Sequence, residues 1–169
     1  MTVTLRPARF PDDLPVIRAL FTEYIASLGL DLRFQNPEAE RAALPGDYAP
    51  PRGALMIAEQ DGQPVGIGAM RPLPDGTAEM KRMYLRPSAR GKGAGRALAV
   101  ALIDAARAAG CGVMRLDTQR DFTAAVALYR SLGFRERARY NDNPLPGSLF
   151  MALDLGAGRD SAASLASGA

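Results

Sequence analysis

The sequence contains no histidine and only one cysteine, Cys111. Without histidine there can be no Ser-His-Asp triad, no Cys-His pair and no imidazole ligand for a metal ion. A single cysteine forms neither an intramolecular disulfide nor a thiolate cluster. We therefore expect no bound metal and no hydrolase chemistry of these kinds. Cys111 stands in a Gly-Cys-Gly turn, where a small, half-buried thiol is the simplest interpretation.

Long hydrophobic runs are also missing. The longest uninterrupted apolar stretch is the seven residues 97–103, whereas a membrane-spanning helix needs about 20. No apolar run follows the charges near the start, as it would in a secretory signal. These features predict a cytoplasmic protein with a reduced thiol and no membrane partner.

The composition is that of an ordinary globular protein. The chain has 169 residues, of which 47% are hydrophobic and 23% charged, a size and balance that fit one domain. We expect that domain to cover residues 1–155. Residues 156–169 are mostly Gly, Ala and Ser, too poor in apolar side chains to order themselves, so we expect a flexible tail.

Positive charge is concentrated in one short segment. The formal net charge is +3, but residues 1–80 carry seven Arg against eleven acidic residues, a net charge of −4. Residues 81–103 carry six basic residues and no acidic one. Charge of one sign in so short a window indicates an anionic partner. The basic residues cluster at one turn with little aromatic interleaving, so we do not expect nucleic acid to be that partner.

Hydrophobic periodicity and turn residues predict an α/β chain with a mixed sheet and helices packed on it. The expected strands lie at 3–6, 54–60, 65–71, 77–86, 113–118, 134–139 and 148–155, and the expected helices at 14–28, 38–44, 93–109 and 123–132. Strands 54–60, 65–71 and 77–86 are joined by short turns and should be antiparallel. In the first helix, the stripe Leu14, Ile17, Phe21, Ile25 and Leu28 is expected in the core rather than against a ligand.

A glycine-rich turn stands between strand 77–86 and helix 93–109. Gly91, Gly93 and Gly95 alternate with other residues, so that successive backbone N–H groups could surround an anion, and the helix N-terminus favours negative charge. Neither a Walker A loop nor a dinucleotide fingerprint fits, because Gly93 follows Lys92 and Arg96 holds the sixth position. We interpret the turn as a phosphate-binding loop; the alternative is a plain turn with a solvated basic rim.

The segment from Arg90 to Gly95 matches the Arg/Gln-x-x-Gly-x-Gly/Ala motif of the GNAT superfamily of acyl-CoA-dependent N-acetyltransferases. The preceding 83–87 is similar to the strand that enters that loop, and 125–134 to the family's Tyr-containing helix with its Gly-Phe exit. The resemblance covers about residues 3–155. It implies a mostly antiparallel central sheet, splayed between its fourth and fifth strands, with helices on both faces.

The resemblance also implies acetyl-CoA as the acyl donor. The backbone N–H groups of the loop would bind its pyrophosphate, and the strand before the loop would pair with its pantetheine arm. The residues implied are Met83, Tyr84, Leu85, Arg90, Gly91, Lys92, Gly93, Ala94, Gly95 and Arg96. Many family members have an Asn at the position of Phe122; here Thr118 or Thr123 would replace its contact.

Three groups are expected to carry the chemistry. The resemblance implies that Tyr129 protonates the leaving sulfur; the alternative is a core aromatic with its hydroxyl tied to a neighbour. Glu79 is the expected base, directly or through a water, unless it is a strand residue paired with Arg71 or Arg82, and Asp117 is the second candidate. The backbone N–H of Leu85 could polarise the carbonyl. By the period of two, Glu79, Lys81, Met83 and Leu85 should share one face.

The acceptor is expected to be a primary amine of a small molecule. Arg33 and Arg52 could bind a carboxylate, which would suit an amino-acid-like amine. The polar, Pro-containing loop 140–147 would either overhang the acceptor or simply connect two strands. Two alternatives remain open, a non-catalytic acetyl-CoA sensor and a protein or peptide N-acetyltransferase. A homodimer through the last strands is common in such folds.

Overall fold

The computed structural model describes residues 2–156, so the predicted tail lies, apart from Gly156, outside the described residues. The helices and strands are β1 (Val3–Pro7), α1 (Leu14–Leu28), α2 (Pro37–Ala43), β2 (Ala54–Gln60), β3 (Gln63–Pro72), β4 (Ala78–Leu85), α3 (Ala94–Ala108), β5 (Val113–Gln119), α4 (Thr123–Ser131), β6 (Arg135–Glu136) and β7 (Ser148–Asp154). Short 3₁₀ turns at Arg33–Gln35, Gly46–Tyr48 and Pro87–Ala89 complete the order. Each predicted element is present.

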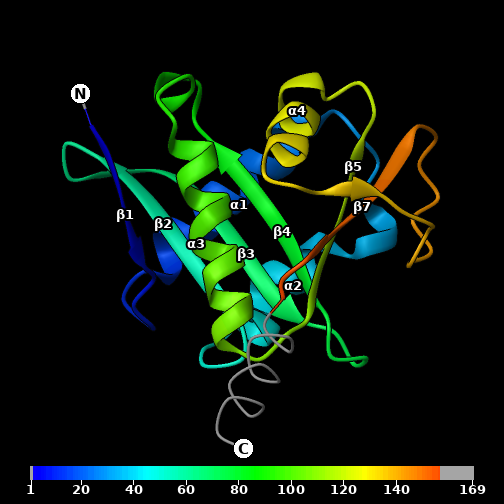
Figure 1. Cartoon of the computed structure of the whole chain (residues 1–169). Coiled ribbons are helices and arrows are strands. Elements are labelled where there is room, and N and C mark those ends of the chain that lie inside the picture. Colours follow the sequence, from blue (N-terminus) through cyan, green and yellow to red (C-terminus); the bar gives the residue numbers. More distant parts are fainter. Residues whose placement is uncertain (1, 157–169) are drawn as a thin grey trace, which may run out of the picture.

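The strands form one mixed sheet in the order β1-β2-β3-β4-β5-β7-β6 (Figure 1). The pairs β2–β3 and β3–β4 are antiparallel, as predicted, and β4–β5 is the only parallel pair among the strands of residues 2–156. The expected strand 134–139 is reduced to Arg135–Glu136. The chain leaves the sheet there because the side chains from Tyr140 to Asn143 turn toward β4 and β5, where they find hydrogen-bond partners.

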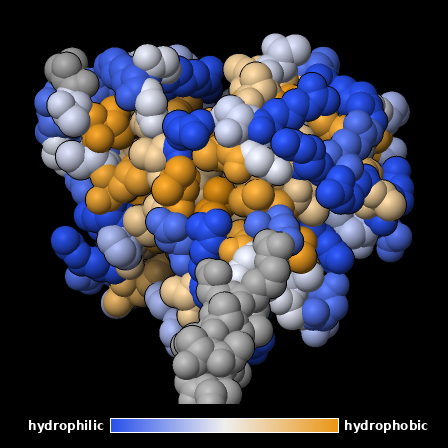
Figure 2. Space-filling model, viewed as in Figure 1, coloured by the Kyte–Doolittle hydropathy of each residue, from blue (hydrophilic) through white to orange (hydrophobic). Residues whose placement is uncertain are grey.

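Helices cover both faces of the sheet. α3 and α4 lie on one face and α1 and α2 on the other (Figure 1). The core under α3 and α4 includes Leu102, Met114 and Phe134, all fully buried, and the core under α1 includes Ile17 and Ile57. Figure 2 shows hydrophobic residues over the middle of the α3 side, with hydrophilic residues around them.

The apolar stripe of α1 is core over most of its length. Ile17 and Phe21 are buried against β2 and β3, and Leu14 and Ile25 pack on the same cluster. The prediction is wrong for Leu28, which lines a cavity with Tyr24. The last turn of α1 reaches the part of the sheet where β4 and β5 have separated, so no strand lies beneath Leu28 to cover it.

The sheet is splayed between its fourth and fifth strands. β4 and β5 pair only at Ala78 with Met114 and at Glu79 with Arg115. Beyond Glu79 the two strands diverge, and the edge of β4 that faces β5 has no strand partner. This opening passes through the sheet and positions the site described below.

A β-bulge in β4 changes which side chains share a face. Ala69 pairs with Lys81 and Ile67 with Tyr84, so that Arg82 and Met83 together oppose Gly68. Arg82 has a left-handed φ of 60°, and a bulge of this kind turns the following side chains over. The expected common face is therefore wrong.

The side chains of Glu79 and Lys81 lie on the α2 side, along a cavity that Glu40 also lines. Those of Met83 and Leu85, beyond the bulge, pack under α3 against Leu98.

Candidate active site

A narrow cavity of about 130 Å³ occupies the opening between β4 and β5. We call it the splay groove. Its walls come from both faces of the sheet, with Tyr24 and Leu28 from α1, and Phe122 and Tyr129 from the start and the end of α4. Met83 and Thr118 contribute from the two diverging strands. The groove can therefore accommodate a thin chain that passes between two strand edges.

The glycine-rich loop follows directly after β4. Gly91 and Gly93 have φ of 76° and 80°, a left-handed conformation that favours glycine. Among residues 2–156, the backbone N–H groups of residues 91–96 donate to no protein acceptor. Arg90 and Lys92 are exposed beside them, and Arg96 donates to Ser131 Oγ on α4 at 2.9 Å. Unpaired N–H groups, a helix N-terminus and three cations form a site that fits phosphate.

Met83, Tyr84 and Leu85 contact β3 through one backbone edge only. Ile67 pairs with Tyr84 and Gly66 with Leu85, while the opposite edge faces the groove. Arg86 N–H donates to Val65 O at 2.8 Å. Because N–H groups alternate in direction along a strand, the N–H of Leu85 points away from β3, toward the groove.

Tyr129 is buried in the core at the edge of the groove. It is 8% exposed and lines the splay groove, while its ring packs edge-on against Phe134 with centroids 5.8 Å apart. Burial raises the pKa of Tyr129, so its hydroxyl keeps its proton at neutral pH.

Of the two threonines considered, Thr118 lines the splay groove, whereas Thr123 lines a separate cavity with Arg120 and Arg130. Phe122 itself stands in the groove wall. The structure therefore brings Thr118, and not Thr123, to the groove.

A wider cavity of about 490 Å³ adjoins the groove. Its lining includes Arg71, Glu79, Arg115 and the loop residues from Tyr140 to Asn143. The loop 140–147 therefore connects β6 to β7 and also lines this cavity. Four residues line both the wide cavity and the splay groove: Gln35, Lys81, Asp117 and Asn143. The two spaces meet at these side chains.

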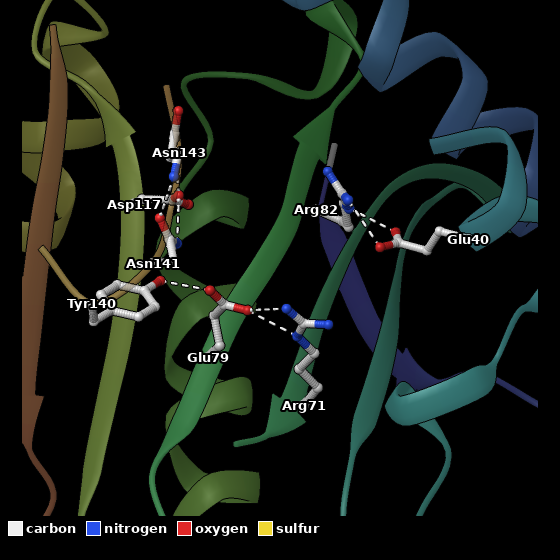
Figure 3. A network of polar contacts seen from close by, with 8 residues as sticks. All are labelled: Glu40, Arg71, Glu79, Arg82, Asp117, Tyr140, Asn141 and Asn143. Atoms are coloured by element: carbon white, nitrogen blue, oxygen red, sulfur yellow. Dashed lines mark hydrogen bonds and ion pairs between the residues drawn. The ribbon is translucent and has the colours of Figure 1, made fainter. Parts of the chain in front are cut away.

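Glu79 is buried at the base of the wide cavity with both carboxylate oxygens occupied. Arg71 Nε donates to Oε1 at 2.8 Å, and Tyr140 Oη donates to Oε2 at 2.6 Å (Figure 3). Burial and the nearby Glu79 carboxylate raise the pKa of Tyr140, which keeps its phenol protonated as a donor. The predicted partner Arg71 is present; Arg82 pairs with Glu40 instead, at 2.7 and 2.9 Å.

Asp117 is held by two amide side chains. Asn141 Nδ2 and Asn143 Nδ2 each donate to its Oδ2 at 3.0 Å (Figure 3). Its Oδ1 has no hydrogen-bond partner in the described part of the chain. The sequence analysis singled out Asp117 and the loop 140–147 separately but did not predict the contact between them. The signal for this contact was the segment Asn141-Asp142-Asn143, which places two amide side chains two residues apart.

Arg33 and Arg52 line neither space. Arg33 pairs with Asp31 and its side chain is 91% exposed, while Arg52 lies beside Cys111 in a separate cavity. Arg71 and Arg115 occupy the wide cavity in their place. The structure therefore does not bring Arg33 and Arg52 together at either space. The arginines of the wide cavity come instead from β3 and β5, which align with β4 in register. Cys111 is buried, and burial raises the pKa of its thiol.

The remaining features of residues 2–156 concern membrane-spanning helices and metal-binding clusters. No helix in this range is long and apolar enough to cross a membrane. No group of three His, Cys, Asp or Glu side chains in the same range could hold a metal ion.

Comparison with known proteins agrees with this geometry. The model of the acetyltransferase (GNAT) family matches residues 18–134. An uncharacterized N-acetyltransferase from Schizosaccharomyces pombe is 35% identical over 155 residues, which cover 90% of this chain and 95% of the relative.

Two solved structures share the fold. A GNAT-family acetyltransferase from Staphylococcus aureus Mu50 has a TM-score of 0.74 at 18% identity, covering 91% of this chain and 99% of that one. The structure of yncA from Salmonella typhimurium, solved with its cofactor acetyl-CoA, has a TM-score of 0.68 at 24% identity, covering 92% and 95%. A loop with unpaired N–H groups, a splayed sheet and a match over most of the chain lead to one conclusion: this protein belongs to the acetyltransferase (GNAT) family.

Proposed function

We propose that this acetyltransferase moves an acetyl group from acetyl-CoA to the primary amine of a small molecule. The observation that carries the proposal is the succession of three spaces along β4. The wide cavity lies at Glu79, the splay groove at Met83, and the glycine-rich loop beyond Leu85. A phosphate-bearing, thin and extended donor fits the loop and the groove, and leaves the wide cavity for an acceptor.

The chain's residues fit acetyl-CoA group by group. The N–H groups of residues 91–96, with Arg90 and Lys92 nearby, would bind its phosphates, and the open edge of Met83–Leu85 would pair with its amides. Thr118 offers a hydroxyl in the groove wall. When bound, acetyl-CoA would supply an activated acyl group as a thioester. The acetyl-CoA in the structurally similar Salmonella protein supports this assignment.

Four groups of the chain would assist amine acylation. Tyr129 keeps its proton and faces the groove, as a donor to a leaving sulfur must. The N–H of Leu85 points to the groove and would polarise a carbonyl there. Asp117 has a free oxygen where groove and cavity meet, and can accept a proton from an amine directly. Glu79, with both oxygens occupied, would act through Tyr140 or a water.

The test follows free-thiol release from acetyl-CoA with a panel of small amines, amino acids and peptides. Tyr129→Phe should lower kcat by about 10²-fold or more, the usual contribution of a general acid, while acetyl-CoA affinity stays unchanged. Tyr48→Phe is the matched control, because Tyr48 is a buried tyrosine that lines neither space. Within residues 2–156 its hydroxyl has no hydrogen-bond partner.

Failure of acetyl-CoA to bind would refute the donor assignment. Binding without thiol release from any amine would instead support a non-catalytic sensor, and release with peptides alone a protein or peptide acceptor.

A further inference from the structure

Three charged residues form a row across the sheet at the floor of the wide cavity. Arg71 on β3 pairs in register with Glu79 on β4, and Glu79 pairs with Arg115 on β5. Residues paired in register project to the same face of a sheet, and neighbouring strands are about 4.8 Å apart. Two guanidinium groups therefore flank one carboxylate, and the row has a net charge of +1.

Both arginines keep unused donors. Arg71 directs Nε and Nη2 to the single oxygen Glu79 Oε1, and Arg115 directs Nη1 to Asp75 Oδ2 at 2.8 Å. In the described part of the chain, Arg71 Nη1 and Arg115 Nε and Nη2 have no hydrogen-bond acceptor. The two side chains are 31% and 30% exposed. They can therefore bind a further anionic group from the cavity.

A second row lies two residues further along the strands. Lys81 on β4 and Asp117 on β5 face each other across the splay, and each lines both the groove and the cavity. Two residues along a strand span about 6.6 Å. An anion site at Arg71 and Arg115 thus stands a short distance from the Asp117 carboxylate, which the two asparagine amides hold in place.

The charges around the wide cavity nearly balance. Its lining carries five acidic residues, Glu40, Asp75, Glu79, Asp117 and Asp142, and three basic ones, Arg71, Lys81 and Arg115. Arg82 adds a fourth positive charge through its ion pair with Glu40. A polyamine would need a strongly acidic cavity, whereas a nearly neutral cavity with separated signs suits a zwitterion.

Resting on the proposed function, we propose that the acceptor is a small amino carboxylate, of which an α-amino acid is the simplest. Its carboxylate binds the free donors of Arg115 and Arg71, and its amine contacts Asp117 at the end of the splay groove. Arginine is suited to this role because its planar fork matches the two oxygens of a carboxylate. Asp117 then accepts one proton from the ammonium group, and the neutral amine forms the new C–N bond while the C–S bond breaks and the sulfur takes the Tyr129 proton. The nitrogen of the new amide releases its second proton, directly or through a water, to the Tyr129 phenolate, which restores the phenol.

The test compares matched acceptors. Each amino acid is measured beside its carboxamide, which keeps the amine and the side chain but loses the charge. One hydrogen bond to a charged group contributes about 1.5–3 kcal/mol, or roughly 10- to 100-fold, so we expect kcat/KM to be at least tenfold higher for the acid. Arg115→Gln should reduce that ratio toward one, mainly by raising KM for the acid. Arg52→Gln, an exposed arginine outside the cavity, should leave the ratio unchanged.

Calorimetric titration of the same pairs into the protein with CoA present gives a readout that does not need turnover. A preference for the acid that Arg115→Gln abolishes supports the proposal. Carboxamides that react and bind as well as the acids overturn it, while continued thiol release leaves the acetyltransferase assignment intact. Failure to bind acetyl-CoA would be the separate failure of the proposed function.

Discussion

The ion pair between Arg82 and Glu40 connects the bulge of β4 to α2, and its removal should be costly. The Arg82 side chain is 3% exposed, and its guanidinium bonds both oxygens of Glu40. It also lies 5.2 Å from the centre of the Phe21 ring. The residue has a left-handed φ of 60°, a conformation that costs a non-glycine residue free energy.

The expected magnitude follows from the burial of the two partners. Removing one partner of a fully buried pair costs about 3–5 kcal/mol, because it leaves the other charge uncompensated. The Glu40 side chain is 20% exposed, so water partly solvates its carboxylate. We therefore expect Arg82→Met to lower the free energy of unfolding by about 2–4 kcal/mol. Glu40→Gln should cost a similar amount, and the double variant should be more stable than additivity predicts by about 1–3 kcal/mol.

The assay is urea unfolding followed by far-UV circular dichroism, since the chain has no tryptophan to report by fluorescence. In a thermal scan, each kcal/mol should shift Tm by about 2–4 °C for a domain of this size. Additive effects in the double variant would refute the reasoning. So would a decrease in the free energy of unfolding of less than about 1 kcal/mol for Arg82→Met. Arg33→Met is the control, because Arg33 has an exposed ion pair whose loss should leave the free energy of unfolding nearly unchanged.

Three further predictions concern the strands and the loop around the splay. Gly66→Ala places a Cβ 2.6 Å from Tyr84 O, so it should displace the end of β4 and lower the unfolding free energy by about 1–3 kcal/mol; an unchanged urea midpoint would contradict this. Gly93→Ala forces a side chain into a left-handed conformation, and should cost about 1 kcal/mol and weaken acetyl-CoA binding in calorimetry; unaltered affinity would argue against the loop as the phosphate site. Burial, and then the charge of Arg82, lower the pKa of Lys81 below 10.5. Between the usual lysine pKa and the lower pKa of Lys81 in the folded chain, the unfolded chain binds this proton and the folded chain does not. The free energy of unfolding therefore decreases as the pH falls through this range. Lys81→Met should be more stable than wild type at pH 7, with a difference that vanishes above the usual lysine pKa; a constant difference across pH would contradict it.

Local patterns were sufficient to predict most of the fold. A short apolar run followed by the Asp61-Gly62 turn marks the strand Ala54–Gln60. Gly29 ends α1 in a left-handed conformation, as the position of a glycine after a helical stripe predicts. The glycine-rich loop and Tyr129 were recognisable because each rests on a short contiguous motif. The splay itself came from the resemblance to a family, not from any local pattern.

The rest depends on contacts between distant segments. Nothing in Lys81-Arg82-Met83 marks a bulge, and the ion-pair partner of Arg82 at the bulge, Glu40, lies 42 residues away in sequence. Which arginines line the wide cavity likewise depends on the register of the strands. Arg71 and Arg115 meet at Glu79 only because three strands align there. Spacing along one segment holds no information on such alignments.

The splay gives the sheet four free edges instead of two. β1 and β6 form the outer edges, and the inner edges of β4 and β5 face each other across the groove. Exposed strand edges usually invite pairing with strands of other protein molecules. Here the opening holds only about 130 Å³ and is walled by helix side chains on both faces. These side chains restrict access to the inner edges, so a slender ligand can reach them more readily than a polypeptide strand with side chains on alternate faces.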